Sequence, residues 1–155
     1  MKPDLERQTA PEGSSPTRVP RILDSGWVAV DPWWGKIHPI ELHPGLRTFG
    51  EIEVIEQIRS GGALVDTRRP EYAEASGTLP GSKAIHWETI GDRKDEIDPD
   101  QLTVLFCNGP QCSATPRAVR ILLGLGRDPT GLAYYRGGIR DWISLGLPTV
   151  SADRG

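Results

Sequence analysis

Apolar residues between positions 48 and 150 alternate between helical spacing and short continuous runs. Three isoleucines recur at helical spacing within Glu51–Ser60, and two glycines end this segment. The apolar run Ala63–Asp66 follows the glycines and predicts a short buried strand. The same alternation continues toward the C-terminus and predicts more elements of both kinds.

Further strands are predicted at Lys83–Trp87, Thr103–Phe106 and Leu132–Tyr135, and further helices at Pro70–Ser76, Pro116–Leu125 and Ile139–Leu145. Short apolar strands that alternate with helices indicate an α/β fold with a mainly parallel sheet. Such sheets bind ligands beyond the carboxyl ends of their strands. Functional residues are therefore expected directly after Val65, Ile85, Phe106 and Tyr135.

The N-terminal part of the chain lacks this regular pattern. Residues 1–25 begin with a stretch rich in Pro, Ser, Glu and Arg, which predicts a flexible leader. Residues 26–47 contain three tryptophans, and such large aromatic side chains favour burial. We expect an ordered, Trp-rich N-terminal arm packed on a domain formed by residues 48–150.

Composition and charge narrow the class of protein. The 155 residues suit one domain, and 37% hydrophobic with 25% charged residues is typical of a folded globular chain. The net charge is -3 with no basic run, so no nucleic-acid partner is expected. No apolar run suits a signal peptide or a membrane span, so we expect a cytoplasmic protein without a membrane partner. The two cysteines then stay reduced, which indicates chemistry or packing rather than a permanent disulfide.

The loop after Phe106 carries the strongest chemical signal. Cys107 stands where a buried strand is predicted to end, and small or turn-forming residues follow it. Thr115 suits a helix N-cap, and Pro116 suits the first helical position. Inward-facing backbone amides in such a loop form an anion cradle. The expected cradle consists of Asn108, Gly109, Pro110, Gln111, Cys112, Ser113, Ala114 and Thr115.

A thiol in an anion cradle should have a lowered pKa, because the cradle stabilises the charged form. The thiolate is the nucleophilic form of cysteine. We therefore predict that Cys107 is the catalytic nucleophile. The alternative is that Cys107 is a small buried apolar residue.

Five segments in order make the sequence resemble the rhodanese superfamily. They are Leu64–Arg68 with Glu71, Leu79–Ile85, Val104–Cys107, Tyr135–Trp142 and Leu145–Pro148. The resemblance implies a rhodanese-like fold, with a five-stranded, mainly parallel sheet and helices on both faces. It also implies a sulfurtransferase that needs no cofactor. A Cys107 persulfide would carry a sulfane sulfur from a small donor, such as thiosulfate or a persulfide, to a thiol, a protein acceptor or cyanide.

The loop departs from the family pattern in one respect. Its stretch to the predicted helix is about two residues longer, and it contains no Lys or Arg before Arg117. A cation at this place would hold an oxyanion. Its absence from the loop favours a persulfide or a neutral donor over thiosulfate.

Cys112 has three interpretations. It is a resolving thiol that forms a disulfide with Cys107, or it only lines the loop. The third interpretation makes it an alternative nucleophile, because the spacing from Cys112 to Arg117 matches the family's spacing of Cys and Arg. No metal site is expected, because the pair is not Cys-x-x-Cys and no second ligand pair is evident.

Other candidates follow the predicted strands. Asp66 and Arg68 are expected to contact each other or Glu71 and to support the cysteine loop. Arg136 and His86 are candidates for substrate binding. Two other functions stay open beside sulfur transfer. One is a thiol redox protein or reductase that cycles a disulfide between its two cysteines, and the other is a non-catalytic rhodanese-like binding module.

Overall fold

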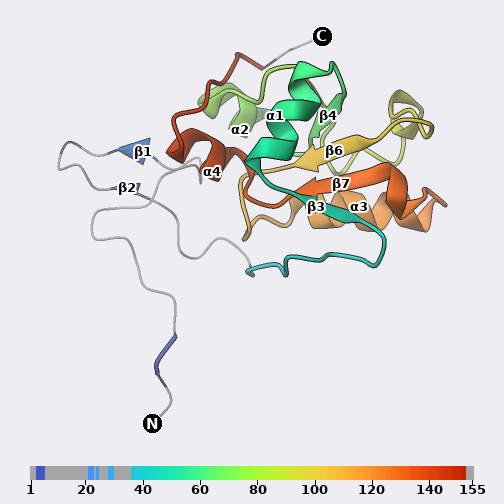
Figure 1. The fold of residues 1–155 in the computed structure, drawn as a ribbon, viewed down its shortest axis with the longest axis horizontal. Coiled ribbons are helices and arrows are strands. Elements are labelled where there is room, and N and C mark those ends of the chain that lie inside the picture. The colour runs from blue at the N-terminus through green and yellow to red at the C-terminus, as the bar shows by residue number, and fades with distance from the viewer. Residues whose placement is uncertain (1–2, 6–20, 23, 25–27, 30–35, 153–155) are drawn as a thin grey trace.

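The computed structural model describes residues 3–5, 21–22, 24, 28–29 and 36–152. Five parallel strands form one sheet in the order β3-β7-β6-β4-β5 (Figure 1). The strands are β3 (Arg47–Phe49), β4 (Ala63–Asp66), β5 (Ser82–Ala84), β6 (Thr103–Phe106) and β7 (Leu132–Tyr135). The predicted α/β fold with a parallel five-stranded sheet is thus confirmed.

In the described part of the chain, four helices cover the two faces of this sheet. They are α1 (Glu51–Arg59), α2 (Pro70–Ser76), α3 (Ala114–Gly124) and α4 (Gly138–Ser144). Two short 3-10 helices, η1 (Lys94–Glu96) and η2 (Pro129–Gly131), lie in connections. No helix among the described residues is long and apolar enough to cross a membrane.

Side chains of the central strands alternate between two hydrophobic cores. Val104 and Phe106 of β6 belong to the core that contains Val54 of α1 and Trp142 of α4. The intervening Leu105 belongs to the core under α3. This period of two places α1 and α4 on one face and α3 on the other (Figure 1). The middle strands are buried on both faces, which explains their continuous apolar runs.

Predicted and observed elements agree best in the middle of the sheet. β4, β6, β7 and α2 have the predicted bounds, whereas β5 ends before the predicted Ile85–Trp87. β3 was not predicted from the apolar pattern, because it has only three residues and lies at an edge. Among the helices, the start of α3 shifts most, because α3 begins at Ala114 instead of Pro116.

The predicted N-terminal arm is described only in part. Trp27, Trp33 and Trp34 lie outside the described residues, as does most of the predicted leader, so the packing of a Trp-rich arm stays a prediction. The short strands β1 (Arg21–Ile22) and β2 (Val28–Ala29) pair with each other. Residues 36–47 do contact the domain, since the His38 amide donates a hydrogen bond to the Pro110 carbonyl at 2.8 Å.

The start of α4 is bonded to the loop that follows β6. The amide of Ile139 donates to the Cys107 carbonyl at 3.0 Å, and that of Arg140 donates to the Asn108 carbonyl at 2.9 Å. Gly138 makes this approach possible, because it has a φ of +62° and a Cβ there would lie 2.3 Å from the Cys107 carbonyl oxygen. The glycine thus lets a helix start pack on the cysteine loop.

We therefore expect Gly138→Ala to lower the free energy of unfolding by about 2–3 kcal/mol, because it combines left-handed strain with a backbone clash. Gly146→Ala is the matched control, since Gly146 has a φ of +73° and no atom within 4 Å of a Cβ. It should cost about 1 kcal/mol. Urea unfolding measures both values, and equal losses in the two variants would contradict the packing role.

Candidate functional site

The two cysteines lie in the loop between β6 and α3, at the carboxyl end of the sheet. Cys107 directly follows β6, and Ser113 is the N-cap residue of α3. The Cys112 amide donates to the Gly109 carbonyl at 3.1 Å, which closes a tight turn between the two thiols. The loop thus brings Cys112 back to the end of the strand that carries Cys107.

The predicted start of α3 at Pro116 was wrong, and so was the predicted cap at Thr115. Proline is tolerated throughout the first helical turn, because the amides of that turn have no acceptor inside the helix. Thr115 is buried inside the first turn, where its hydroxyl lies 2.9 Å from that of Thr67 at the end of β4. The loop is therefore shorter than predicted, and Cys112 lies directly before the cap of α3.

A cavity of about 410 Å³ opens beside this loop, and only one of the two cysteines lines it. Cys112 is 8% exposed and forms part of the wall, whereas Cys107 is 1% exposed and does not. The two side chains still belong to one buried cluster, which Trp87 covers in part. A ligand in the cavity therefore meets Cys112 first.

Burial and hydrogen bonding give the two thiols opposite pKa shifts. Burial raises the pKa of Cys107 well above its usual range, and the neighbouring sulfur of Cys112 raises it further. A hydrogen bond from the Cys107 thiol is the largest cause that lowers the pKa of Cys112, to about 7. Backbone amides of Ala114 and Asn108 and the charge of Arg68 lower it too. Cys112 is therefore the thiol that ionises near neutral pH, whereas Cys107 stays protonated.

The predicted lowering of the Cys107 pKa was therefore wrong. The anion-stabilising groups of the loop surround Cys112, five residues further along the chain. For Cys107, burial outweighs the hydrogen bonds from the Thr115 hydroxyl and amide and keeps the thiol protonated. The loop itself was predicted correctly, but strand position alone did not distinguish its two thiols.

The other residues of the predicted cradle separate into two groups. Four of them line the cavity together with Cys112: Asn108, Gln111, Ser113 and Ala114. The remaining three form the packing side of the loop. Gly109 lies against α4, the Pro110 carbonyl accepts from His38, and Thr115 binds Thr67.

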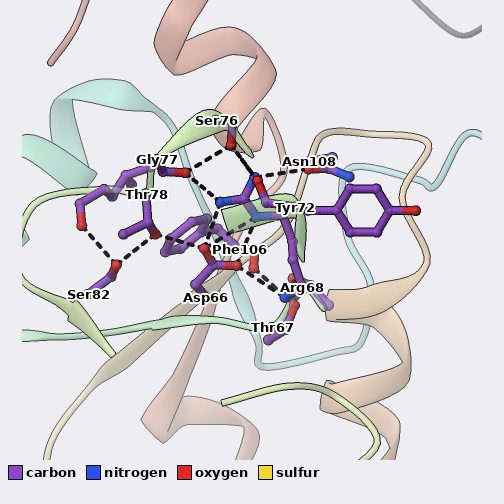
Figure 2. Close-up of polar contacts among 12 residues, drawn as sticks. Asp66, Thr67, Arg68, Tyr72, Ser76, Gly77, Thr78, Ser82, Phe106 and Asn108 are labelled. Atoms are coloured by element: carbon purple, nitrogen blue, oxygen red, sulfur yellow. Dashed lines mark hydrogen bonds and ion pairs between the residues drawn. The ribbon is translucent and has the colours of Figure 1, made fainter. Parts of the chain in front are cut away.

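Asp66 and Arg68 meet at the end of β4, as expected. The Arg68 guanidinium donates to the Asp66 carboxylate at 2.7 Å, and the side chains are 0% and 2% exposed. Figure 2 shows the same guanidinium reaching Ser76, the Gly77 carbonyl and the Asn108 side chain. Because Asn108 directly follows Cys107, this network connects the neighbouring strand β4 to the cysteine loop. Glu71, the third residue of the predicted set, lines the cavity instead.

Several cavity residues were not identified as site residues from the sequence. Arg69 and Tyr72 come from the region of α2, Trp87 follows β5, and Arg117 lies in α3. The Arg117 guanidinium lies 4.7 Å from the centroid of the Trp87 ring. The one sequence signal was the spacing between Cys112 and Arg117. Arg69, Tyr72 and Trp87 are brought to the cavity beside Cys112 only by the fold.

The two candidates for substrate binding lie elsewhere. Arg136 donates through Nε and Nη2 to the His38 carbonyl, at 3.0 and 2.8 Å, and is not among the residues that line the cavity beside Cys112. His86 lies against Trp87 and is absent from the cavity wall too. Burial lowers the pKa of His86, so the neutral imidazole is favoured at pH 7. Neither side chain is therefore part of the wall that a small ligand at Cys112 would meet.

The hydrogen bond between the two thiols predicts a pH effect on reactivity. The alkylation rate of Cys112 should rise with pH through a midpoint near 7, because only the thiolate reacts. Cys107→Ala removes the largest cause of the lowered pKa, so alkylation at pH 7 should slow by about fivefold. Cys107→Ser keeps a donor and serves as the control. A pH profile that is the same in both variants would exclude the hydrogen bond as the cause.

The buried ion pair predicts a large stability effect. Asp66→Asn leaves the Arg68 charge buried without a counter-charge, which should lower the free energy of unfolding by about 3–5 kcal/mol. The exposed pair of Arg69 and Glu88, at 2.8 Å, offers the control. Glu88→Gln should cost less than about 1 kcal/mol. Urea unfolding of both variants tests the difference, and comparable losses would contradict it.

Comparisons with known proteins agree with this architecture. The thiosulfate sulfurtransferase from Pseudomonas aeruginosa is 21% identical, covers 74% of this chain and 22% of its own, and superposes with a TM-score of 0.60. A rhodanese-related protein from Thermoplasma volcanium is 20% identical over 67% of this chain and 97% of its own, with a TM-score of 0.53. Likeness at these identities shows the fold.

One curated relative is the HTH-type transcriptional regulator Rv0324 of Mycobacterium tuberculosis, which is 30% identical over 96 residues. The match covers 62% of this chain but only 41% of that relative. The model of the Rhodanese-like domain matches residues 52–145, which run from the first turn of α1 to the end of α4 and include both cysteines. The chain therefore belongs to the Rhodanese-like domain family.

Proposed function

We propose that this domain is a sulfurtransferase in which Cys112 carries the transferred sulfur as a persulfide. The observation that supports this assignment is that Cys112 alone of the two thiols lines the cavity, with a pKa lowered to about 7. A nucleophile must be both ionised and accessible to its substrate. This proposal moves the nucleophile from Cys107, the residue predicted from the sequence, to Cys112 in the same loop.

The reaction consists of two displacements. The Cys112 thiolate attacks the outer sulfur of a donor, the sulfur–sulfur bond of the donor breaks, and the leaving group departs with the electron pair. Cys112 then carries a persulfide. An acceptor thiolate attacks the terminal sulfur, and the Cys112 thiolate leaves in turn. No cofactor takes part, and Cys107 acts through its hydrogen bond to the Cys112 sulfur.

A second candidate function is a redox cycle between the two thiols. The observation in its favour is that both thiols belong to one buried cluster, in which the Cys107 thiol donates to the Cys112 backbone carbonyl at 3.6 Å. With a peroxide as oxidant, Cys112 would become a sulfenic acid, and Cys107 would attack it with loss of water to give a disulfide. Sulfur transfer ranks first because a buried thiol with a raised pKa attacks slowly.

Intact mass spectrometry of the purified protein distinguishes these functions. After treatment with excess persulfide or thiosulfate, we expect one additional sulfur atom, which peptide mapping places on Cys112 and which cyanide removes. Cys112→Ser should gain no sulfur, whereas Cys107→Ser should still gain it. Both variants make the same replacement of a thiol by a smaller hydroxyl, so each serves as a control for folding of the other.

Three results would oppose the proposal. Sulfur on Cys107 that persists in Cys112→Ser would return the nucleophile to Cys107. A loss of two hydrogens with a link between the cysteines would favour the redox cycle. No adduct with any donor would favour a non-catalytic binding module.

A further inference from the structure

The arginines around the cavity differ in how their charge is compensated. Arg68 is neutralised by Asp66, and Arg69 forms an ion pair with Glu88 at 2.8 Å. Arg117 forms no ion pair with any carboxylate of the described chain, and its partner is the Trp87 ring. A cation over an aromatic ring keeps its full charge. One uncompensated positive charge therefore remains on the α3 side of the cavity.

Trp87 holds this charge in place beside the reactive sulfur. Its amide donates to the Thr67 carbonyl at 3.0 Å, which fixes the backbone at the end of β5 next to β4. Its indole packs on the cluster that contains Cys107, Cys112 and Ala114, and it also lies under the Arg117 guanidinium. Trp87 is thus a positioning residue that links the cation to the site of sulfur transfer.

The opposite charge on the cavity wall comes from Glu71. This exposed carboxylate lies in the first turn of α2, lines the same cavity, and forms no ion pair with an arginine or lysine of the described residues. Glu71 and Arg117 also form no ion pair with each other, although they share the cavity. The wall therefore presents two separated charges of opposite sign on two helices.

The volume of the cavity also indicates how large the donor is. About 410 Å³ lies within the range of sites that hold small organic molecules, and it exceeds what an inorganic anion needs. A donor that is complementary to this wall has a negative group, a positive group and a reactive sulfur on one small scaffold. An α-amino-acid thiol has all three once its sulfur is converted to a persulfide.

We infer that the sulfur donor is the persulfide of a small α-amino-acid thiol, with its carboxylate at Arg117 and its ammonium at Glu71. The inference rests on the proposed function. The Cys112 thiolate attacks the terminal sulfur, the sulfur–sulfur bond breaks, and the amino-acid thiolate leaves with the electron pair. The two charged contacts recognise the carboxylate and the ammonium of the donor. Its side-chain persulfide then points toward Cys112.

A set of three disulfides tests the charge selection without any need for sulfur transfer. Cystine has both charges, cystamine has only the ammonium groups, and dithiodipropionate has only the carboxylates. The Cys112 thiolate attacks one sulfur of each reagent and releases one thiolate, which leaves a mixed disulfide that mass spectrometry can follow. A Cys107→Ser background keeps that mixed disulfide from being resolved.

The expected rates form a crossed pattern. Arg117→Gln should slow the reaction with cystine and dithiodipropionate by about three- to tenfold and leave cystamine unchanged. Glu71→Gln should slow cystine and cystamine and leave dithiodipropionate unchanged. Arg120→Gln is the matched control, since Arg120 is exposed on the same helix but lies outside this cavity, and it should change none of the rates.

Sulfur transfer from cysteine persulfide and from N-acetylcysteine persulfide, which lacks the ammonium, completes the test. We expect kcat/KM to be higher for cysteine persulfide, and Glu71→Gln to abolish that preference. Equal rates for all three disulfides, or equal losses with all three in Arg117→Gln, would overturn the inference whether or not sulfur is transferred. The crossed pattern without any sulfur transfer would overturn the proposed function and keep the charge selection.

Discussion

The buried guanidinium of Arg68 is the interaction on which the rest of the site depends. Its charge is buried at the carboxyl end of the central strands, so the Asp66 carboxylate has to remain within contact. The guanidinium donors left over from this pair bind the end of α2 and the Asn108 side chain (Figure 2). One ion pair thereby fixes α2, β4 and the cysteine loop relative to one another.

That fixed frame explains why two thiols in one loop differ so much. Cys107 continues the buried strand β6, and the start of α4 closes over its carbonyl. Cys112 lies at the open end of the turn, among amide donors and near the charge of Arg68. Burial penalises a negative charge, whereas amides and cations favour it, so the shared proton stays on Cys107. The difference arises from position in the fold, because the two residues are chemically identical.

The sequence was informative where one local rule decides the structure. The apolar runs Thr103–Phe106 and Leu132–Tyr135 lie in the middle of the sheet, where both faces are buried, and their bounds were predicted correctly. The edge strand Arg47–Phe49 is half-exposed and too short to show a period, so its pattern had no strand signal. Edge strands obtain their register mainly from a neighbour, here β7.

The site was predictable only in part, for a related reason. Motif and strand position identified the loop and the pair formed by Asp66 and Arg68, because these features depend on short stretches of chain. The choice between the cysteines depends on burial, and the cavity wall combines α2, the end of β5 and α3. Contacts of this kind, between segments distant in sequence, have no signature in a single sequence. Pro116 misplaced the start of α3 because proline is compatible with more than one position in a first helical turn.

The same burial that keeps Cys107 protonated also favours transfer over disulfide formation. A persulfide on Cys112 can lose its sulfur to an acceptor that enters the cavity, or it can be attacked from inside by Cys107. Attack from inside requires the Cys107 thiolate, which burial makes scarce near neutral pH, whereas an acceptor thiol in the cavity is partly solvated and ionises more easily. Cys107 can therefore lower the pKa of Cys112 as a hydrogen-bond donor while it competes weakly as a nucleophile. A thiol at position 107 is compatible with sulfur transfer as long as it stays buried. The packing of Gly138 against the Cys107 carbonyl keeps this end of β6 covered.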